Sequence, residues 1–136
     1  MVFKRKLNLT KVDLRGNLFL EKAMKLSEIP EVILDQEDYK YLLLEIFSFE
    51  ENRSVLIIRG CEKPGYHYNI LWEQKKTYTE DEFRISVIGG GSVSIVFINE
   101  NRGVILAGKS WDYGREPDRG VTAEILRRHF PVVSFS

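Results

Sequence analysis

The chain has 136 residues, of which 43% are hydrophobic and 29% are charged, and this composition is typical of one globular domain. Its 20 basic and 20 acidic side chains leave no net charge, so it lacks the basic excess that nucleic-acid and anionic-membrane binders need. No apolar run approaches the ~20 residues of a membrane span, and the one cysteine, Cys61, permits no internal disulfide and indicates a reducing compartment. We therefore expect a cytoplasmic protein that binds neither nucleic acid nor membranes.

Residues 1–28 are predicted to be an extension that precedes the main domain at residues 29–136. The extension is basic and mildly apolar, but it has no continuous apolar stretch like that of a secretory signal. Asn17 is a candidate N-cap for a short helix over residues 18–26, and Pro30 disfavours helix at the residue before it.

The main domain begins with a series of predicted strands. These strands are expected at residues 31–35, 39–49 and 54–60. The second is apolar on both faces, as in a central strand that is covered on both sides. A turn at Pro64 and Gly65 follows, and from Tyr66 the apolar residues recur at helical spacing, with His67 and Ile70 on one face.

The second half of the chain continues the strands and ends with a helix and a strand. Strands are expected at residues 83–88, 92–98 and 103–110, a helix at residues 121–130, and a last strand at residues 131–135. The triple glycine from Gly89 to Gly91 is expected to separate the first two, and Pro131 favours an edge position for the last strand. Runs of consecutive strands exclude a doubly wound sheet. We predict an α/β fold, a single-domain sandwich with a central mixed sheet of about six strands and helices packed on both faces.

His67 is the main candidate for chemistry. A lone histidine is usually a core or surface residue, and that interpretation stays open. Its place in the first turn of the predicted helix offers another, because the unpaired N–H groups and the positive dipole end of a helix start can hold an anion. The same field disfavours the imidazolium ion, so the ring stays neutral and nucleophilic near pH 7.

Three other features could take part in binding an anion. The loop "GKSWDYG" at residues 108–114 is bracketed by glycines, so it is either a nest of inward N–H groups or a plain connection. The triple glycine lacks the Lys-Ser/Thr ending of a P-loop and is better explained by a bulge or a tight hairpin. Lys40 and Arg59 lie at predicted strand ends, where a charged side chain is usually just a surface charge. Lys40 could instead supply the positive charge that a phosphate needs. The two histidines and the cysteine show no ligand spacing, so we predict no metal and no cofactor.

Taken together, four segments resemble one known family. The segments are "IPEVILDQEDYKYLLLEI", "IIRGCEKPGYHYNI", "VIGGGSVSI" and "GKSWDYG", and their order and spacing are similar to those of the protein histidine phosphatases of the Janus/Ocnus family. The resemblance covers Leu26 to Phe135. It implies a six-stranded α/β sandwich with helices on both sides, which hydrolyses phosphohistidine, and in some members phospholysine, on proteins without a metal.

The resemblance also implies roles for particular residues. His67 matches the family's catalytic histidine, as nucleophile or general base, Lys40 its phosphate-binding lysine, and Arg59 a strand-end arginine with a supporting role. The resemblance implies that the phosphate is held by the backbone N–H groups of Tyr66, His67, Ser110, Trp111 and Asp112, with the Ser110 hydroxyl nearby. The pattern differs at Asp112, where a small residue is usual, and at Ser92, where an arginine is common.

The expected partner is a protein that carries phosphohistidine, and the chain is expected to be a monomer. Because Asp112 and Ser92 make the expected pocket less positive, there is an alternative to the enzyme. It is a non-catalytic member of the same family that binds phosphoproteins or regulates them.

Overall fold

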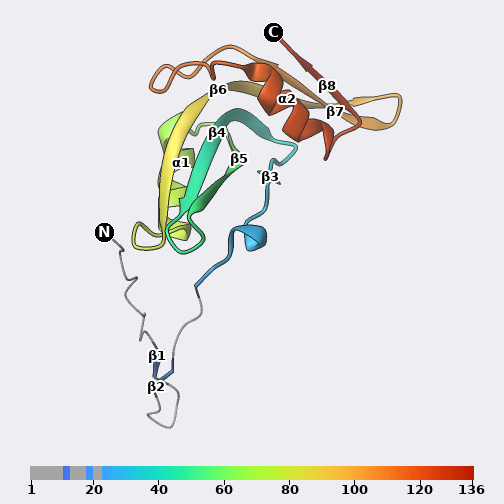
Figure 1. The fold of residues 1–136 in the computed structure, drawn as a ribbon. Coiled ribbons are helices and arrows are strands. Elements are labelled where there is room, and N and C mark those ends of the chain that lie inside the picture. Colours follow the sequence, from blue (N-terminus) through green and yellow to red (C-terminus); the bar gives the residue numbers. More distant parts are fainter. Residues whose placement is uncertain (1–10, 13–17, 20–22) are drawn as a thin grey trace.

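The computed structural model of the chain describes residues 11–12, 18–19 and 23–136 (Figure 1). Its elements, in chain order, are β1 (Lys11–Val12), β2 (Leu18–Phe19), the 3-10 helix η1 (Leu26–Glu28), β3 (Val32–Ile33), β4 (Asp38–Ser48), β5 (Arg53–Glu62), α1 (His67–Thr77), β6 (Phe83–Ile98), β7 (Asn101–Ala107), α2 (Arg119–Arg127) and β8 (Val132–Phe135). Among the described residues, neither helix has the length and apolar character needed to cross a membrane.

Six of the strands form one mixed sheet in the order β3-β5-β4-β6-β7-β8. The outer pairs, β3 with β5 and β7 with β8, are parallel, and the three inner pairs are antiparallel. The predicted α/β domain with a central mixed sheet of six strands is therefore confirmed, and β8 lies at an edge as expected.

The N-terminal segment differs from the helix expected over residues 18–26. Leu18 and Phe19 form β2, which pairs with β1, and helical structure is limited to the single turn η1. The turn is capped from elsewhere in the chain, because the Leu26 N–H donates to Glu51 Oε2 at 2.7 Å. The expected cap, Asn17, and residues 20–22 lie outside the described residues.

The triple glycine does not divide two strands, as the sequence suggested, but lies within β6. The pairing of β6 with β4 continues through it, with a register shift opposite Leu43 and Leu44 that confirms the expected bulge. A Cβ atom on Gly89, whose φ is +153°, would lie 2.3 Å from the backbone nitrogen of Glu116, and one on Gly90 would lie 2.2 Å from the Tyr41 carbonyl oxygen. The glycines therefore admit close neighbours to the strand without ending it.

The core consists of two clusters that share β4. Successive side chains of a strand point to opposite faces, and Tyr41 packs in a cluster with Leu126 of α2, whereas Leu42 packs in a cluster with Ile70 of α1. Burying each such side chain stabilises the fold by about 1.5–3 kcal/mol. Helix α1 packs against β4, β5 and β6, and α2 packs beside β8 (Figure 1). This packing fixes the start of α1, at His67, near the start of β4.

Helix α2 was expected over residues 121–130. It begins two residues earlier, at Arg119, and ends three residues earlier, at Arg127. Its start is set by Asp118, whose Oδ1 accepts the Gly120 N–H at 2.9 Å. Helix α1 begins directly after Tyr66, which confirms the change to helical spacing seen in the sequence.

Candidate functional site

A pocket of about 250 Å³ lies where the start of β4, the first turn of α1, the middle of β6 and the loop after β7 meet. It is lined by Tyr39, Lys40, Tyr66, His67, Gly91, Ser92, Gly108, Lys109, Trp111 and Asp112. The sheet register explains this convergence, because Ser92 faces Lys40 on β4 and Ala107 on β7. Five residues that the sequence assigned to one site thus line one pocket: Lys40, Tyr66, His67, Trp111 and Asp112.

The imidazole of His67 is held in one orientation by the backbone of β6. His67 is 7% exposed, and its Nε2 lies 2.9 Å from the Gly91 carbonyl oxygen. A carbonyl oxygen can only accept, so Nε2 carries the hydrogen and the neutral ring keeps its lone pair on Nδ1. The third glycine of β6 therefore selects the tautomer of the histidine.

The pKa of His67 lies below its ordinary value of 6.5, chiefly because burial disfavours the charged ring. The Lys40 ammonium lowers this pKa further, whereas the hydrogen bond to Gly91 and the Asp112 carboxylate raise it. Since the unfolded chain takes up the proton first as the pH falls, protonation favours unfolding. The contribution of His67 to the free energy of unfolding is therefore lost as the pH falls from 6.5 to the pKa of the folded state, and this contribution changes no further below it.

We predict that an NMR titration of the ring protons gives His67 a pKa below 6.5 and that two substitutions move it in opposite directions. Lys40→Met removes a nearby positive charge and raises the pKa, and Asp112→Asn removes a nearby negative charge and lowers it. Shifts of the same sign in both variants would contradict the arrangement of charges in the pocket.

Lys40 supplies the pocket with a positive charge. Its Nζ lies 4.6 Å from the ring centroid of Tyr66 and 5.1 Å from that of Tyr39, and it forms no ion pair within the described part of the chain. Ser92 adds a neutral hydroxyl, which donates to the Ala107 carbonyl oxygen at 3.1 Å. The ammonium is thus positioned for an anion.

The five backbone N–H groups expected to hold a phosphate are not equivalent. The Tyr66 N–H donates to Asn69 Oδ1 at 2.7 Å, and the Ser110 N–H donates to the Gly90 carbonyl oxygen at 3.2 Å, so both already have acceptors. For the N–H groups of His67, Trp111 and Asp112, the described residues provide no acceptor. These three are the donors open to an anion.

Ser110 closes the loop and does not line the pocket. It is 1% exposed, its Oγ accepts the Tyr113 N–H at 3.1 Å, and its carbonyl oxygen accepts the Gly114 N–H at 2.9 Å. The next residue, Trp111, is 91% exposed, so its side chain stands at the rim of the pocket. The loop is thus a tight, internally bonded turn that presents residues 111 and 112.

Most of the chain matches the model of a known protein family. The model of the Janus/Ocnus family (Ocnus) matches residues 26–134. The chain belongs to the Janus/Ocnus family. None of the curated proteins compared with the chain matches it. The matched range includes every residue that lines the pocket of this family member.

Arg59, expected in a supporting role, lies under α1 and outside the pocket lining. It is 2% exposed, and it donates to Gln74 Oε1 at 3.0 Å, to the Pro30 carbonyl oxygen at 2.8 Å and to the Tyr78 hydroxyl at 3.3 Å. Burial lowers the pKa of its guanidinium. In this Janus/Ocnus chain, Arg59 therefore ties the second half of α1 to the segment before β3.

A buried hydrogen-bond network around Glu116 and Arg119, which the sequence did not reveal, lies next to the pocket. Arg119 Nε donates to Glu116 Oε1 at 2.9 Å, and its Nη2 donates to the carbonyl oxygens of Gly90 at 3.3 Å and Gly108 at 2.6 Å. The Tyr41 hydroxyl also donates to Glu116, at 2.7 Å. In the sequence this Glu–Arg pair, three residues apart near a helix start, looks like any exposed pair, so only the fold shows that it is buried.

Lys109 is a further pocket residue that the sequence did not single out, although it lies within the "GKSWDYG" motif. It lines the pocket, and its Nζ lies 5.5 Å from the ring centroid of Trp111. A lysine in a polar loop usually carries no more than a solvated charge, so its position relative to His67 had to come from the structure.

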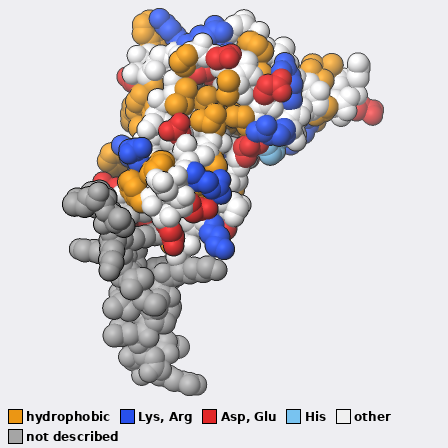
Figure 2. Space-filling model, viewed as in Figure 1, with side chains coloured by type: hydrophobic (Ala, Val, Ile, Leu, Met, Phe, Trp, Pro, Cys, Tyr) orange, Lys and Arg blue, Asp and Glu red, His pale blue; other side chains and the backbone are white. Residues whose placement is uncertain are grey.

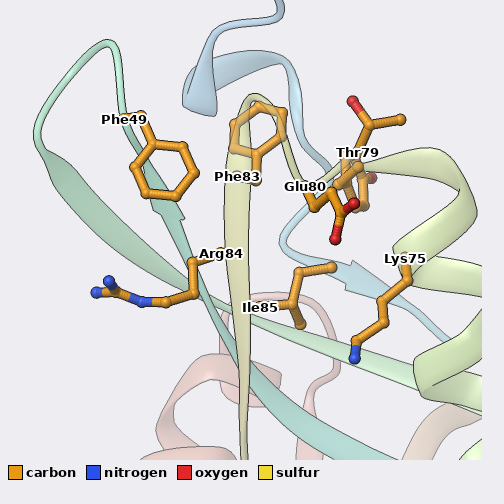
Figure 3. A pocket seen from close by; sticks show the side chains of 8 residues that line it. Phe49, Lys75, Thr79, Glu80, Phe83, Arg84 and Ile85 are labelled. Atoms are coloured by element: carbon orange, nitrogen blue, oxygen red, sulfur yellow. The ribbon is translucent and has the colours of Figure 1, made fainter. Parts of the chain in front are cut away.

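Two larger hollows lie elsewhere. One, of about 590 Å³, is at the opposite end of β4 and is walled by Phe49, Phe83 and Ile85 with charged side chains around them (Figure 3). The other, of about 740 Å³, adjoins α2, on a face where hydrophobic side chains gather beside charges of both signs (Figure 2). Neither lining includes a histidine or cysteine, so the smaller pocket around His67 is the candidate site.

Proposed function

We propose that the chain is a protein histidine phosphatase that hydrolyses phosphohistidine, and phospholysine, on proteins. The observation that carries this proposal is the fixed, neutral imidazole of His67. It shares a pocket with the Lys40 ammonium, which has no ion-pair partner among the described residues, and with open backbone N–H groups. Membership of the Janus/Ocnus family supports it. An imidazole with a low pKa is nucleophilic at neutral pH, and the donors beside it suit a phosphoryl group.

The proposed reaction uses groups of the chain and water. Nδ1 of His67 attacks phosphorus, the P–N bond of the substrate breaks, and its electron pair returns to the leaving nitrogen. Water then releases phosphate from the ring. In the other version, Nδ1 takes a proton from a water that attacks phosphorus directly. In both, Lys40 and the N–H groups stabilise the charge that develops on the equatorial oxygens.

The proposal is tested by the release of inorganic phosphate from a phosphohistidine peptide, measured against spontaneous hydrolysis. We expect the native chain to accelerate this release. A native chain that binds the peptide but releases no phosphate would instead be a non-catalytic, phosphoprotein-binding member of the family. A native chain that neither binds the peptide nor releases phosphate from it would have no phosphate site.

We expect Lys40→Met to weaken the binding of inorganic phosphate roughly 10-fold, because it removes a charge-assisted contact. Isothermal titration or inhibition by phosphate measures this change. Lys63→Met is the matched control, because Lys63 also lies over the Tyr39 ring, at 5.4 Å, but does not line the pocket. Equal losses in the two variants would indicate a general effect of charge and would contradict a specific contact.

A further inference from the structure

The pocket holds charges of both signs that do not neutralise each other. Lys40 and Asp112 both line it, and within the residues that the structure describes neither takes part in an ion pair. A plain phosphate is attracted by Lys40 and by Lys109, which also lines the pocket, and is repelled by Asp112. Asp112 is exposed, so water solvates its carboxylate in the free chain, and a ligand that brings its own positive charge can replace that water with a charge-assisted contact. The pocket therefore suits a ligand with a cationic group next to its phosphoryl group.

The carboxylate belongs to a loop that is fastened to the same strand as the imidazole. The Ser110 N–H donates to the Gly90 carbonyl oxygen at 3.2 Å, and the Gly90 N–H donates to the Gly114 carbonyl oxygen at 2.9 Å. Both ends of the turn that carries Asp112 are thus bonded to Gly90. The next residue of β6, Gly91, accepts the hydrogen bond of the imidazole. Gly90 and Gly91 therefore fix the backbone of the turn that carries Asp112 relative to the His67 ring.

We propose that Asp112 determines the substrate class of the pocket: its carboxylate accepts a hydrogen bond from the N–H of a cationic leaving group, so that phosphoramidates are preferred to phosphate esters. This inference rests on the proposed phosphatase function. Phosphohistidine protonated on its free ring nitrogen and phospholysine protonated on its amine both carry such an N–H. Esters of serine, threonine and tyrosine have none, and Asp112 repels their dianionic phosphoryl group.

The transfer of the phosphoryl group from the substrate to His67 requires no proton transfer to Asp112. The substrate enters with its leaving group protonated and its phosphoryl group dianionic, and His67 is neutral. The P–N bond breaks as the bond from Nδ1 of His67 to phosphorus forms, and the leaving group departs as a neutral imidazole or amine that keeps its proton. Water then cleaves the phosphorylated ring and yields dihydrogen phosphate and neutral His67. The Asp112 carboxylate stabilises the cationic leaving group on binding and orients it for departure.

The test compares kcat/KM for a phosphohistidine peptide, a phospholysine peptide and p-nitrophenyl phosphate in the native chain and in Asp112→Asn. We expect the variant to lose roughly 10- to 100-fold on both phosphoramidates, as for the loss of a charge-assisted hydrogen bond, and to keep or increase its rate on the ester. An unchanged ratio of phosphoramidate to ester, or a faster variant on phosphohistidine, would overturn the role of Asp112.

Asp118→Asn is the matched control, because Asp118 lies in the same segment, outside the pocket lining, and an asparagine Oδ1 can still accept the Gly120 N–H. We expect it to leave all three rates unchanged. If the native chain is no faster than His67→Gln on any substrate, the proposed phosphatase function fails. The role of Asp112 is then decided by binding: the zwitterionic phosphoramidate ion should bind more tightly than inorganic phosphate, and Asp112→Asn should abolish that preference. Equal binding of the two ions by the native chain would overturn it.

Discussion

His67→Gln is expected to lower the release of phosphate from a phosphohistidine peptide on the order of 100- to 10,000-fold. The substitution removes the Nδ1 lone pair that either attacks phosphorus or takes a proton from water. It keeps a donor, because the glutamine amide can still reach toward the Gly91 carbonyl oxygen, which accepts from Nε2 in the native chain at 2.9 Å. Steady-state phosphate release and mass spectrometry of the quenched enzyme measure the loss and any phosphorylated His67.

His67→Ala is the companion variant that separates chemistry from folding. It leaves the Gly91 carbonyl oxygen without its partner, so we expect it to lower the free energy of unfolding by about 1–3 kcal/mol, whereas His67→Gln costs less. Both variants should be equally inactive. A His67→Gln protein that is folded and retains native turnover would show that the catalytic group lies elsewhere.

Arg119→Met is expected to lower the free energy of unfolding by about 3–5 kcal/mol, the usual cost of removing one partner of a buried ion pair. The side chains of Arg119 and Glu116 have no exposed surface, and Nη2 of the arginine lies 2.9 Å from Glu116 Oε1. Its loss leaves the Glu116 carboxylate buried with only neutral donors, among them Thr122. It also removes one donor from each of the carbonyl oxygens of Gly90 and Gly108, and Gly108 lines the pocket. Urea denaturation measures the change.

Arg127→Met is the matched control for this prediction. Arg127 lies on the same helix and forms an ion pair with Glu124 at 2.6 Å, but the two side chains are 44% and 70% exposed. Exposed pairs contribute about 0–1 kcal/mol, so this variant should unfold at nearly the native urea concentration. Similar losses in the two arginine variants would mean that the network next to the pocket is not the stabilising feature that its burial indicates.

The sequence by itself determined the class of fold and the central part of the candidate site. The two-sided apolar run of β4 and the change to helical spacing at Tyr66 predicted a covered central strand followed by a helix, because these signals depend only on neighbouring residues. Lys40 and His67, which lie near the starts of these two elements, were assigned to one site by the resemblance to the Janus/Ocnus family. The same resemblance added Trp111 and Asp112 of the motif "GKSWDYG", and both line the pocket.

Only the tertiary structure decided which groups are available and which are already used. Tyr66 and Ser110 were expected to offer N–H groups, but both donate within the chain, and Arg59 lies under α1. The unbroken course of β6 through its glycines depends on the approach of Glu116 and Tyr41, which are distant in sequence. Such outcomes follow from strand register and close packing between segments far apart in the chain, and local sequence patterns carry no record of these contacts.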